Sequence, residues 1–228
     1  MPYKPRKHQL EGGIAYHLWN RSNRRFEIFH EDEDYELFKS ILGRYVLKFG
    51  LLIYHYSLMP NHYHLETEIE VVERMSSAMA GVNKSYTNYY HKKYGTCGFL
   101  WQGRFKSKPV QKNEYFLSCA RYIENNPVRA KFVEKPEQYL YSSARYYVSG
   151  KPDGIITEDP LYCEFGATVE EMRHNYSEFL ENSKEAKAEA QKYGFCDFDK
   201  PLGDKDFNAR VCSRNGRKYP RRRGRVRN

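Results

Sequence analysis

The chain has 228 residues and a formal net charge of +9, and 40% of its residues are apolar. This length and composition predict one globular domain with an extension and exclude an intrinsically disordered protein. No run approaches the roughly 18 uncharged apolar residues of a membrane span. No apolar run follows the basic start, as a secretory signal would require. We therefore expect a cytoplasmic protein without a membrane partner.

The charge is distributed unevenly along the chain. Residues 1–150 carry 22 basic and 15 acidic residues, residues 151–208 carry 7 and 14, and residues 209–228 carry 9 and none. Basic surfaces attract polyanions such as nucleic acid, mainly through the phosphates. The sequence thus predicts a basic body (1–150), an acidic and partly helical extension (151–208), and a basic tail (209–228) that is disordered until it meets an anion.

The chain lacks the short motifs of several common chemistries. Its five cysteines are odd in number and no two have the C-x-x-C spacing, so neither a disulfide framework nor a zinc knuckle is indicated. Neither of the two common glycine-rich phosphate-binding motifs is present, so no nucleotide cofactor is expected.

Hydrophobic spacing predicts alternating strands and helices in the basic body. Asp34 is the predicted cap of a helix that ends at Gly50. Strands are predicted at residues 13–20, 51–59, 62–69 and 106–110, and further helices at residues 71–94, 113–126 and 168–192. This order predicts an α+β fold: a ferredoxin-like split βαβ antiparallel sheet with helices on one face, followed by a C-terminal helical extension and the basic tail.

His62 and His64 are separated by one residue on a predicted strand, so their side chains point to the same face. Two imidazoles can then converge on one divalent ion and leave coordination positions for water and phosphate oxygens. The alternative is that the two histidines only form hydrogen bonds. Glu66 and Glu68 continue this polar face, either as groups near a cation or as the solvated side of the strand.

Tyr122 and Asn126 lie four residues apart on a predicted helix and so share one face. If that face turns toward the two histidines, a phenol and an amide oxygen would reach the same ion. A tyrosine is a poor nucleophile at neutral pH because its reference pKa is about 10, and a divalent cation that polarises a phosphate would offset part of that handicap. Taken alone, Tyr122 is one tyrosine among 21.

Arginines provide candidate contacts to the phosphates of DNA. Arg104 precedes a predicted strand and is equally compatible with a structural ion pair to a carboxylate. The remaining candidates lie in the loop after the first strand and in the tail: Arg21, Arg24, Arg25, Arg222 and Arg223.

Five ordered segments resemble one protein family. They are YHLWNRSN (16–23), LMPNHYHL (58–65), QGRFKS (102–107), RYIENNPVRA (121–130) and YSS (141–143). Together they are similar to the REP-associated tyrosine transposases, relatives of the single-tyrosine HUH transposases of simple bacterial insertion sequences. The chain departs from the family pattern at Tyr63, where an aliphatic residue is usual, and at Ser22, where glycine is usual.

The resemblance implies a mechanism and a set of roles. His62, His64 and Asn126 would be the ligands of Mg²⁺ or Mn²⁺, and Tyr122 would be the nucleophile. The tyrosine would attack a DNA phosphodiester to give a 5′-phosphotyrosine and a free 3′-hydroxyl, and the hydroxyl of a second strand would reverse the step. The implied substrate is single-stranded DNA with foldback hairpins, bound by a monomer or a homodimer.

Two other functions remain open on the sequence. The first is a binding module of the same fold that holds hairpin DNA or RNA without cutting it. The second is a nuclease co-opted by its host, which processes repeats without moving an element. The intact set of His62, His64, Tyr122 and Asn126 favours an enzyme over the binding module.

Overall fold

The computed structural model describes residues 11–196 and 200–214. Its strands are β1 (Ala15–Arg21), β2 (Leu51–Met59), β3 (His62–Ile69) and β4 (Lys106–Val110). Its helices are α1 (Asp32–Phe49), α2 (Val72–Tyr94), α3 (Glu114–Glu124), α4 (Asn126–Arg129), α5 (Ala144–Ser149), α6 (Val169–Glu181), α7 (Ser183–Tyr193) and α8 (Lys205–Arg214). Three short 3₁₀ helices join them: η2 (Asn23–Arg25), η3 (Pro136–Gln138) and η4 (Tyr162–Phe165).

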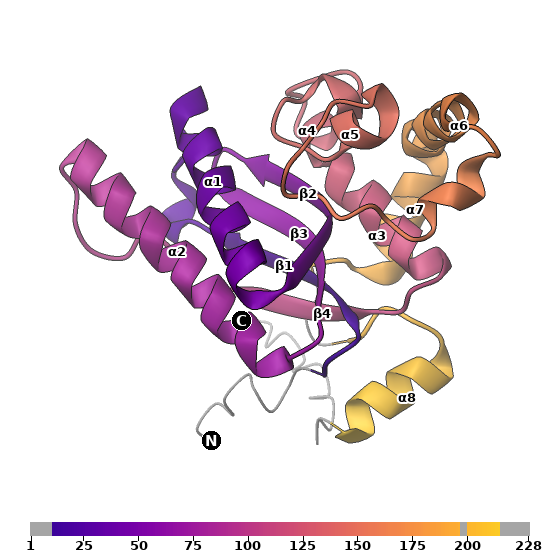
Figure 1. Cartoon of the computed structure of the whole chain (residues 1–228), viewed down its shortest axis with the longest axis horizontal. Coiled ribbons are helices and arrows are strands. Elements are labelled where there is room, and N and C mark those ends of the chain that lie inside the picture. The colour runs from indigo at the N-terminus through magenta and orange to yellow at the C-terminus, as the bar shows by residue number, and fades with distance from the viewer. Residues whose placement is uncertain (1–10, 197–199, 215–228) are drawn as a thin grey trace, which may run out of the picture.

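The four strands form one antiparallel sheet in the order β2-β3-β1-β4 (Figure 1). β3 separates β1 from β2, and β1 separates β3 from β4, so two β-α-β units interleave. This is the ferredoxin-like, split βαβ arrangement. The predicted fold class is therefore confirmed, and the predicted bounds of β2, β3 and β4 are those of the structure.

Local features of the chain determine where α1 begins and ends. Asp34 lies one turn inside the helix, where its carboxylate accepts from the backbone N–H groups of His30 at 2.8 Å and Glu31 at 3.3 Å. The prediction that Asp34 is the cap was therefore wrong by three residues, because the side chain reaches back to satisfy donors that precede it. Gly50 ends the helix as predicted, with a φ of 67° that favours glycine.

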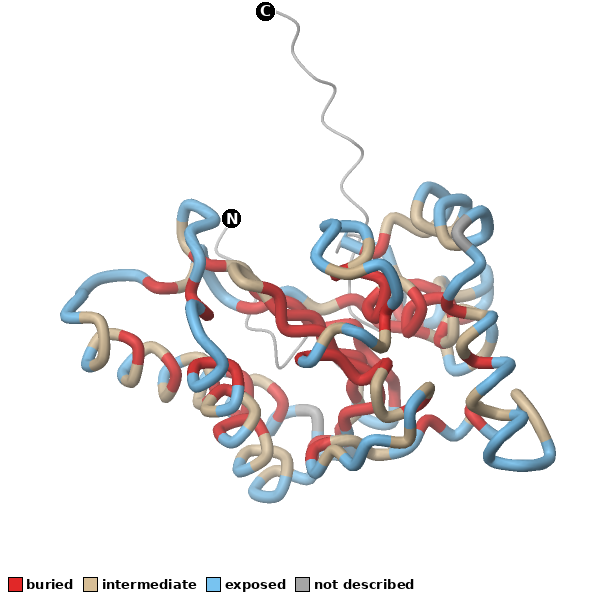
Figure 2. Tube along the Cα trace, turned by 90° about the horizontal axis from the view of Figure 1, so that it is seen from above, coloured by how far each residue is buried: buried red, intermediate tan, exposed pale blue. Residues whose placement is uncertain are grey.

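The sheet has a different core on each face. Tyr63, Leu65 and Ile69 of β3 join α1 and α2 in the main core. The intervening His64 and Glu66 point to the opposite face and are at most 1% exposed. α3 covers that face, packing with residues of β1, β2 and β4 in a second core. In Figure 2 the buried strands run as a red band between the outer helices.

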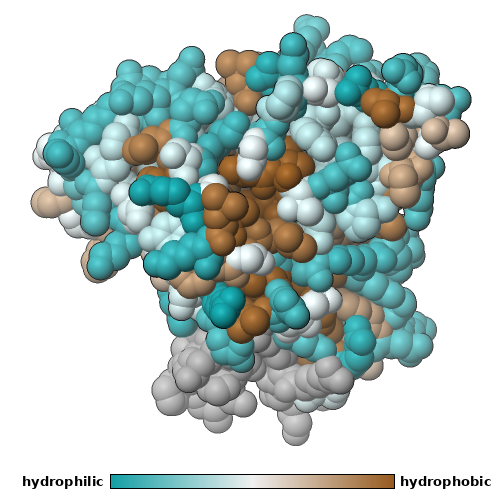
Figure 3. Space-filling view, viewed as in Figure 1, coloured by the Kyte–Doolittle hydropathy of each residue, from teal (hydrophilic) through white to brown (hydrophobic). Residues whose placement is uncertain are grey.

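The prediction that the helices cover one face holds for α1 and α2 and is wrong for α3. α3 excludes water from the polar residues of the second face, and its last residue, Glu124, pairs with His55 there. Figure 1 shows α1 and α2 on one side and α3, α6 and α7 on the other. Figure 3 shows apolar surface gathered in the middle of this view, with hydrophilic surface to either side.

The acidic extension packs against α3. Arg121 of α3 is 2% exposed and forms ion pairs with Glu185 at 2.8 Å and Glu189 at 2.9 Å on α7. The single helix predicted for residues 168–192 is two helices, because the Asn182 side chain accepts from the backbone N–H of Glu185 at 3.3 Å and so caps α7.

Both edges of the sheet are covered by other parts of the same chain. Ser57 of β2 bridges to Ser142, and the neighbouring N–H of Leu58 donates to the Tyr141 carbonyl at 2.9 Å. At the opposite edge, Val110 of β4 bridges to Leu202. Backbone groups that would otherwise be free to pair with another sheet are thus partly satisfied within the chain.

The predicted disordered tail was wrong at its start, since residues 209–214 belong to α8. Phe207 and Val211 of this helix are buried in the main core, which explains why the segment is ordered. The remainder of the tail, with Arg222 and Arg223, lies outside the described residues. Among the described helices, none is long and apolar enough to cross a membrane.

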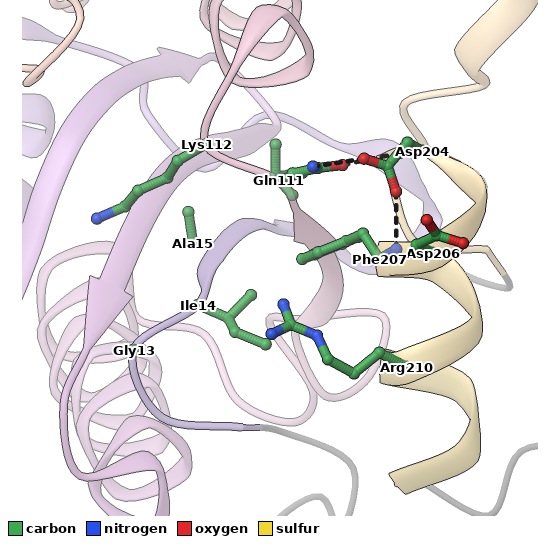
Figure 4. A pocket seen from close by; sticks show the side chains of 10 residues that line it. Gly13, Ile14, Ala15, Gln111, Lys112, Asp204, Asp206, Phe207 and Arg210 are labelled. Atoms are coloured by element: carbon green, nitrogen blue, oxygen red, sulfur yellow. Dashed lines mark hydrogen bonds between the residues drawn. The ribbon is translucent and has the colours of Figure 1, made fainter.

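α8 borders a cavity of about 480 Å³ at the β4 edge. Figure 4 shows Phe207 and Arg210 of α8 on one side and Ile14 on the other. The Gln111 side chain donates to the Asp204 carboxylate at 2.7 Å, so the start of α8 is tied to the end of β4.

A charged cluster is buried between β2, α3 and the extension. Both ring nitrogens of His55 face carboxylates, with Nδ1 3.0 Å from Glu124 and Nε2 3.0 Å from Asp159. Tyr176 also donates to Glu124 at 2.9 Å. Burial alone would lower the pKa of His55, but the two carboxylates outweigh it and raise the pKa to about 10.

We predict that this cluster makes stability depend on pH. The pKa of His55 is above its ordinary value of 6.5, so the contribution is complete below about pH 6.5 and is lost as the pH rises through about 10. His55→Leu should lower the free energy of unfolding near pH 6 by about 3–5 kcal/mol, and the difference should shrink toward pH 10. Urea unfolding at a series of pH values measures it.

His174→Leu is the matched control, because His174 lies on α6 with 72% of its side chain exposed. That variant should keep the wild-type pH dependence. A His55→Leu deficit that stays constant from pH 6 to pH 10 would contradict the prediction.

Candidate active site

The two histidines of β3 lie side by side on the face that α3 covers. The ring centroids of His62 and His64 are 5.1 Å apart and their planes are nearly perpendicular, at 88°. Metal–imidazole bonds are about 2.0–2.1 Å long, so this separation allows both rings to reach one ion. The Nδ1 of His62 lies 2.5 Å from Asn61 Oδ1, and the Nδ1 of His64 lies 2.8 Å from His17 Nε2. Nε2 is therefore the nitrogen that each ring has left to offer a metal.

Both histidines are held in the neutral form that a metal requires. Burial lowers the pKa of His62 to about 4, helped by the nearby charges of Arg21 and Arg129. Burial also lowers the pKa of His64 well below its usual value, with His17 and His62 contributing. Near neutral pH, the two rings are uncharged nitrogen donors.

α3 places Tyr122 against these histidines. The helix starts at Asn113, whose side chain accepts from the backbone N–H of Tyr115 at 3.2 Å. The ring of Tyr122 packs edge-on against His64 and His17, with centroid distances of 5.8 Å to each. The helix face that carries Tyr122 thus turns toward β3.

The Tyr122 hydroxyl is held by groups from outside the sheet. It lies 2.9 Å from Cys196 Sγ, and the ring stacks on Phe195 at 4.5 Å. The Arg129 guanidinium lies 4.5 Å from the ring centroid. Burial and then Cys196 raise the pKa of Tyr122 above its usual value, while Arg129 opposes the shift. In this conformation the phenol is the stable form, so a nucleophilic role requires further help from cationic charge.

Asn126 comes four residues after Tyr122, but the helix predicted for residues 113–126 ends earlier: α3 stops at Glu124, and Asn126 is the first residue of α4, followed by Pro127. Its amide nitrogen donates to the carbonyls of Tyr122 at 2.9 Å and Ile123 at 3.2 Å. This fixes the orientation of the amide and leaves the side-chain oxygen as the atom that could bind a metal.

The donor set fits a divalent cation that also binds phosphate. Within the described residues no group of three or more His, Cys, Asp and Glu side chains could hold a metal. A metal here would therefore rely on His62 and His64 with an amide oxygen, and on oxygens from water or phosphate. Such a mixed nitrogen and oxygen set suits Mn²⁺, and phosphate oxygens also suit Mg²⁺.

Four of the predicted arginines lie within the described residues. Arg21 is directly opposite His62 in the sheet and is partly buried. Arg24 and Arg25 follow it and are exposed. Arg104 is exposed in a loop that lines a cavity of about 720 Å³ beside α2. That loop is attached to the end of β1, since the N–H of Gln102 donates to the Arg21 carbonyl at 2.9 Å.

Two residues beside the site were not predicted as functional. Arg129 belongs to α4, a helix separate from the one that carries Tyr122, so helical spacing along the sequence does not predict their contact. His17 is fully buried and bonded to His64. Its position depends on the register between β1 and β3, which a single sequence does not give.

A ferredoxin-like sheet with two histidines on a central strand, beneath a helix that presents a tyrosine, has the architecture of a single-tyrosine transposase domain. The family described as Transposase IS200 like matches residues 12–126, which is half of the chain. The protein therefore belongs to the IS200-like transposase family, and the matched segment contains His62, His64, Tyr122 and Asn126.

One solved structure with the same fold is a REP-associated tyrosine transposase bound to a REP hairpin. It is 18% identical in sequence, with a TM-score of 0.54, and the match covers 70% of this chain and 92% of that chain. At 18% sequence identity, the similarity of the two structures shows a shared fold. No curated protein sequence matches the chain.

Proposed function

We propose that this transposase is a metal-dependent single-strand DNA endonuclease and strand transferase whose nucleophile is Tyr122. The observation that carries the proposal is the packing of the Tyr122 ring against His64, with centroids 5.8 Å apart. The Tyr122 oxygen attacks a phosphodiester and forms an oxygen–phosphorus bond. The bond from phosphorus to the 3′ oxygen breaks, and the products are a 5′-phosphotyrosine and a free 3′-hydroxyl. A 3′-hydroxyl from a second strand reverses the step and completes strand transfer without ATP.

In this mechanism one set of residues holds the metal ion, and another residue places positive charge beside the nucleophile. His62, His64 and Asn126 would hold Mg²⁺ or Mn²⁺, which supplies positive charge to the phosphate in the transition state. Arg129 lies over the Tyr122 ring and opposes the effect of burial on the pKa of its hydroxyl. The entering phosphodiester replaces the contact between the hydroxyl and Cys196 Sγ.

We infer that the substrate is single-stranded DNA with a foldback hairpin. The related structure was solved with a REP hairpin. Arg24, Arg25 and Arg104 are exposed, and the Arg25 carbonyl accepts from the side chain of Asn61, next to His62. These arginines contact phosphates, so they contribute affinity and register rather than base recognition. Binding should weaken steeply with salt.

The first test is a covalent-adduct assay. Labelled single-stranded DNA containing a hairpin, incubated with the protein and Mn²⁺ or Mg²⁺, should give a product that survives denaturation. Tyr122→Phe removes the attacking oxygen and should abolish the adduct, and His62→Ala should lower its yield at least about 100-fold. Tyr115→Phe, which alters another tyrosine on α3, should leave the adduct unchanged.

Other results of the adduct assay would support different nucleophiles or different functions. An adduct that persists in Tyr122→Phe would move the nucleophile to another tyrosine. Tight hairpin binding without an adduct under either metal would favour the non-cleaving binding module. A nuclease co-opted by its host would give the same adduct, and the genomic surroundings of the gene would distinguish it.

We also propose that the protein acts as a monomer with Tyr122 serving the histidines of its own chain. Two observations support this: the ring of Tyr122 contacts His64 of the same chain, and both sheet edges are covered from within the chain. A dimer that joined two sheets edge to edge would have to displace residues 141–143 or Leu202.

A mixing experiment tests the assignment. Tyr122→Phe keeps the histidines and His64→Ala keeps the tyrosine, so a dimer with exchanged tyrosine helices would contain one complete site. We expect no adduct from the mixture, even after joint refolding, and a monomer mass by light scattering. Recovery of adduct toward a quarter of the wild-type yield would place the tyrosine in trans.

A further inference from the structure

His17 connects a metal-ligand histidine to the C-terminal extension. It lies on β1, is fully buried, and sits on the sheet face that carries His64. Its Nε2 is 2.8 Å from His64 Nδ1, and its Nδ1 is 3.2 Å from the Phe195 carbonyl. The chain of contacts therefore runs from a backbone carbonyl through one imidazole to the next.

The carbonyl at the end of this chain fixes the position of both protons. A carbonyl oxygen only accepts, so Nδ1 of His17 must carry the hydrogen. In neutral His17 the other nitrogen is then an acceptor, and the hydrogen between the rings belongs to Nδ1 of His64. The consequence is that Nε2 of His64 has no hydrogen and presents its lone pair.

The groups around His17 favour its neutral form. Lys108 lies opposite His17 on β4, so a cation faces the buried ring. Glu66 lies opposite on β3, but neither of its carboxyl oxygens forms a hydrogen bond, and both ring nitrogens of His17 are engaged by His64 and Phe195. The edge of Tyr122 approaches from α3. Among the described residues, no carboxylate is hydrogen-bonded to His17, so nothing there stabilises a protonated imidazole.

We propose that His17 is a positioning residue that holds His64 in the tautomer whose Nε2 is free to bind the metal. The inference rests on the metal site of the proposed function. It adds a role for the extension, because the carbonyl that orients His17 belongs to Phe195, directly after α7. A partner of this kind fixes the ring orientation of a ligand histidine and raises its basicity.

The chain next to the Phe195 carbonyl is held in place by hydrogen bonds from β4. Nζ of Lys108 donates to the carbonyls of Tyr193 and Gly194, at 2.8 Å each. Gly194 adopts a φ of 52° and ends α7, which turns the chain back over β1 and β4. One lysine thus fixes the turn that brings the Phe195 carbonyl to His17.

The tautomer can be measured without DNA or metal. Long-range ¹H–¹⁵N correlation spectra of the full chain report which ring nitrogen carries hydrogen, and His64→Asn identifies the His64 signals. We expect the Nδ1–H form in the wild type, and a shift toward the Nε2–H form in His17→Leu, which removes the acceptor. A wild-type His64 in the Nε2–H form would overturn the proposal.

Mn²⁺ affinity provides the second readout, with free Mn²⁺ followed by electron paramagnetic resonance. His17→Leu should weaken binding about 10- to 100-fold, the usual effect of removing such a partner. His17→Gln restores an acceptor at nearly the position of Nε2 and should bind close to wild type. Thr67→Val removes a part-buried hydrogen bond to the Leu52 carbonyl. Thr67 is paired with Tyr16 of the main core, on the other face of the sheet, so Mn²⁺ binding should be unchanged.

The outcomes separate this inference from the function on which it rests. Equal Mn²⁺ affinity in wild type and His17→Leu would overturn the role of His17 while leaving the metal site intact. A wild type that binds no Mn²⁺ would remove the metal site and this inference together. A missing DNA adduct with His17-dependent Mn²⁺ binding would contradict only the proposed cleavage.

Discussion

The sheet face that carries the histidines is polar and yet excluded from water, and the segments packed against it supply partners for its buried polar groups, with the exception of Glu66. A buried polar group costs several kcal/mol of free energy unless it finds a hydrogen-bond partner. His17 and His64 bond to each other, Lys108 bonds to backbone carbonyls, and His55 is held by two carboxylates. α3 and the extension provide most of these partners. The same segments that build the site therefore stabilise the fold.

This arrangement also fixes where the nucleophile stands. The histidines are on a central strand, whereas Tyr122 is on a helix that could in principle shift along the sheet. Such a shift would break the fully buried pair of Glu124 with His55 and the pairing of the buried Arg121 with α7. Loss of the Glu124–His55 pair alone would leave an uncompensated buried charge, at a cost of about 3–5 kcal/mol. The reach of Tyr122 toward the histidines is thus set by contacts outside the reacting groups.

Features set by local sequence patterns, such as strands and the faces of their side chains, could be predicted. Features set by contacts between distant segments, such as burial, could not. Alternation along residues 62–69 gave both the strand and the shared face of His62 and His64. The same alternation left open whether Glu66 was solvated, and the structure buries it completely. The difference comes from α3, about 50 residues later in the chain. Local periodicity reports that a face is polar, but not that another segment will cover it.

The acidic extension is part of the packing that builds the site. Its carboxylates Glu185 and Glu189 are paired with Arg121 on α3, whereas Arg24 and Arg25 remain exposed at the opposite end of β1. The extension therefore neutralises a buried arginine and leaves basic surface available for phosphates. Because the same helix pair delivers Phe195 to Tyr122 and His17, an extension loosened from α3 would disturb both the tyrosine and the orientation of His64.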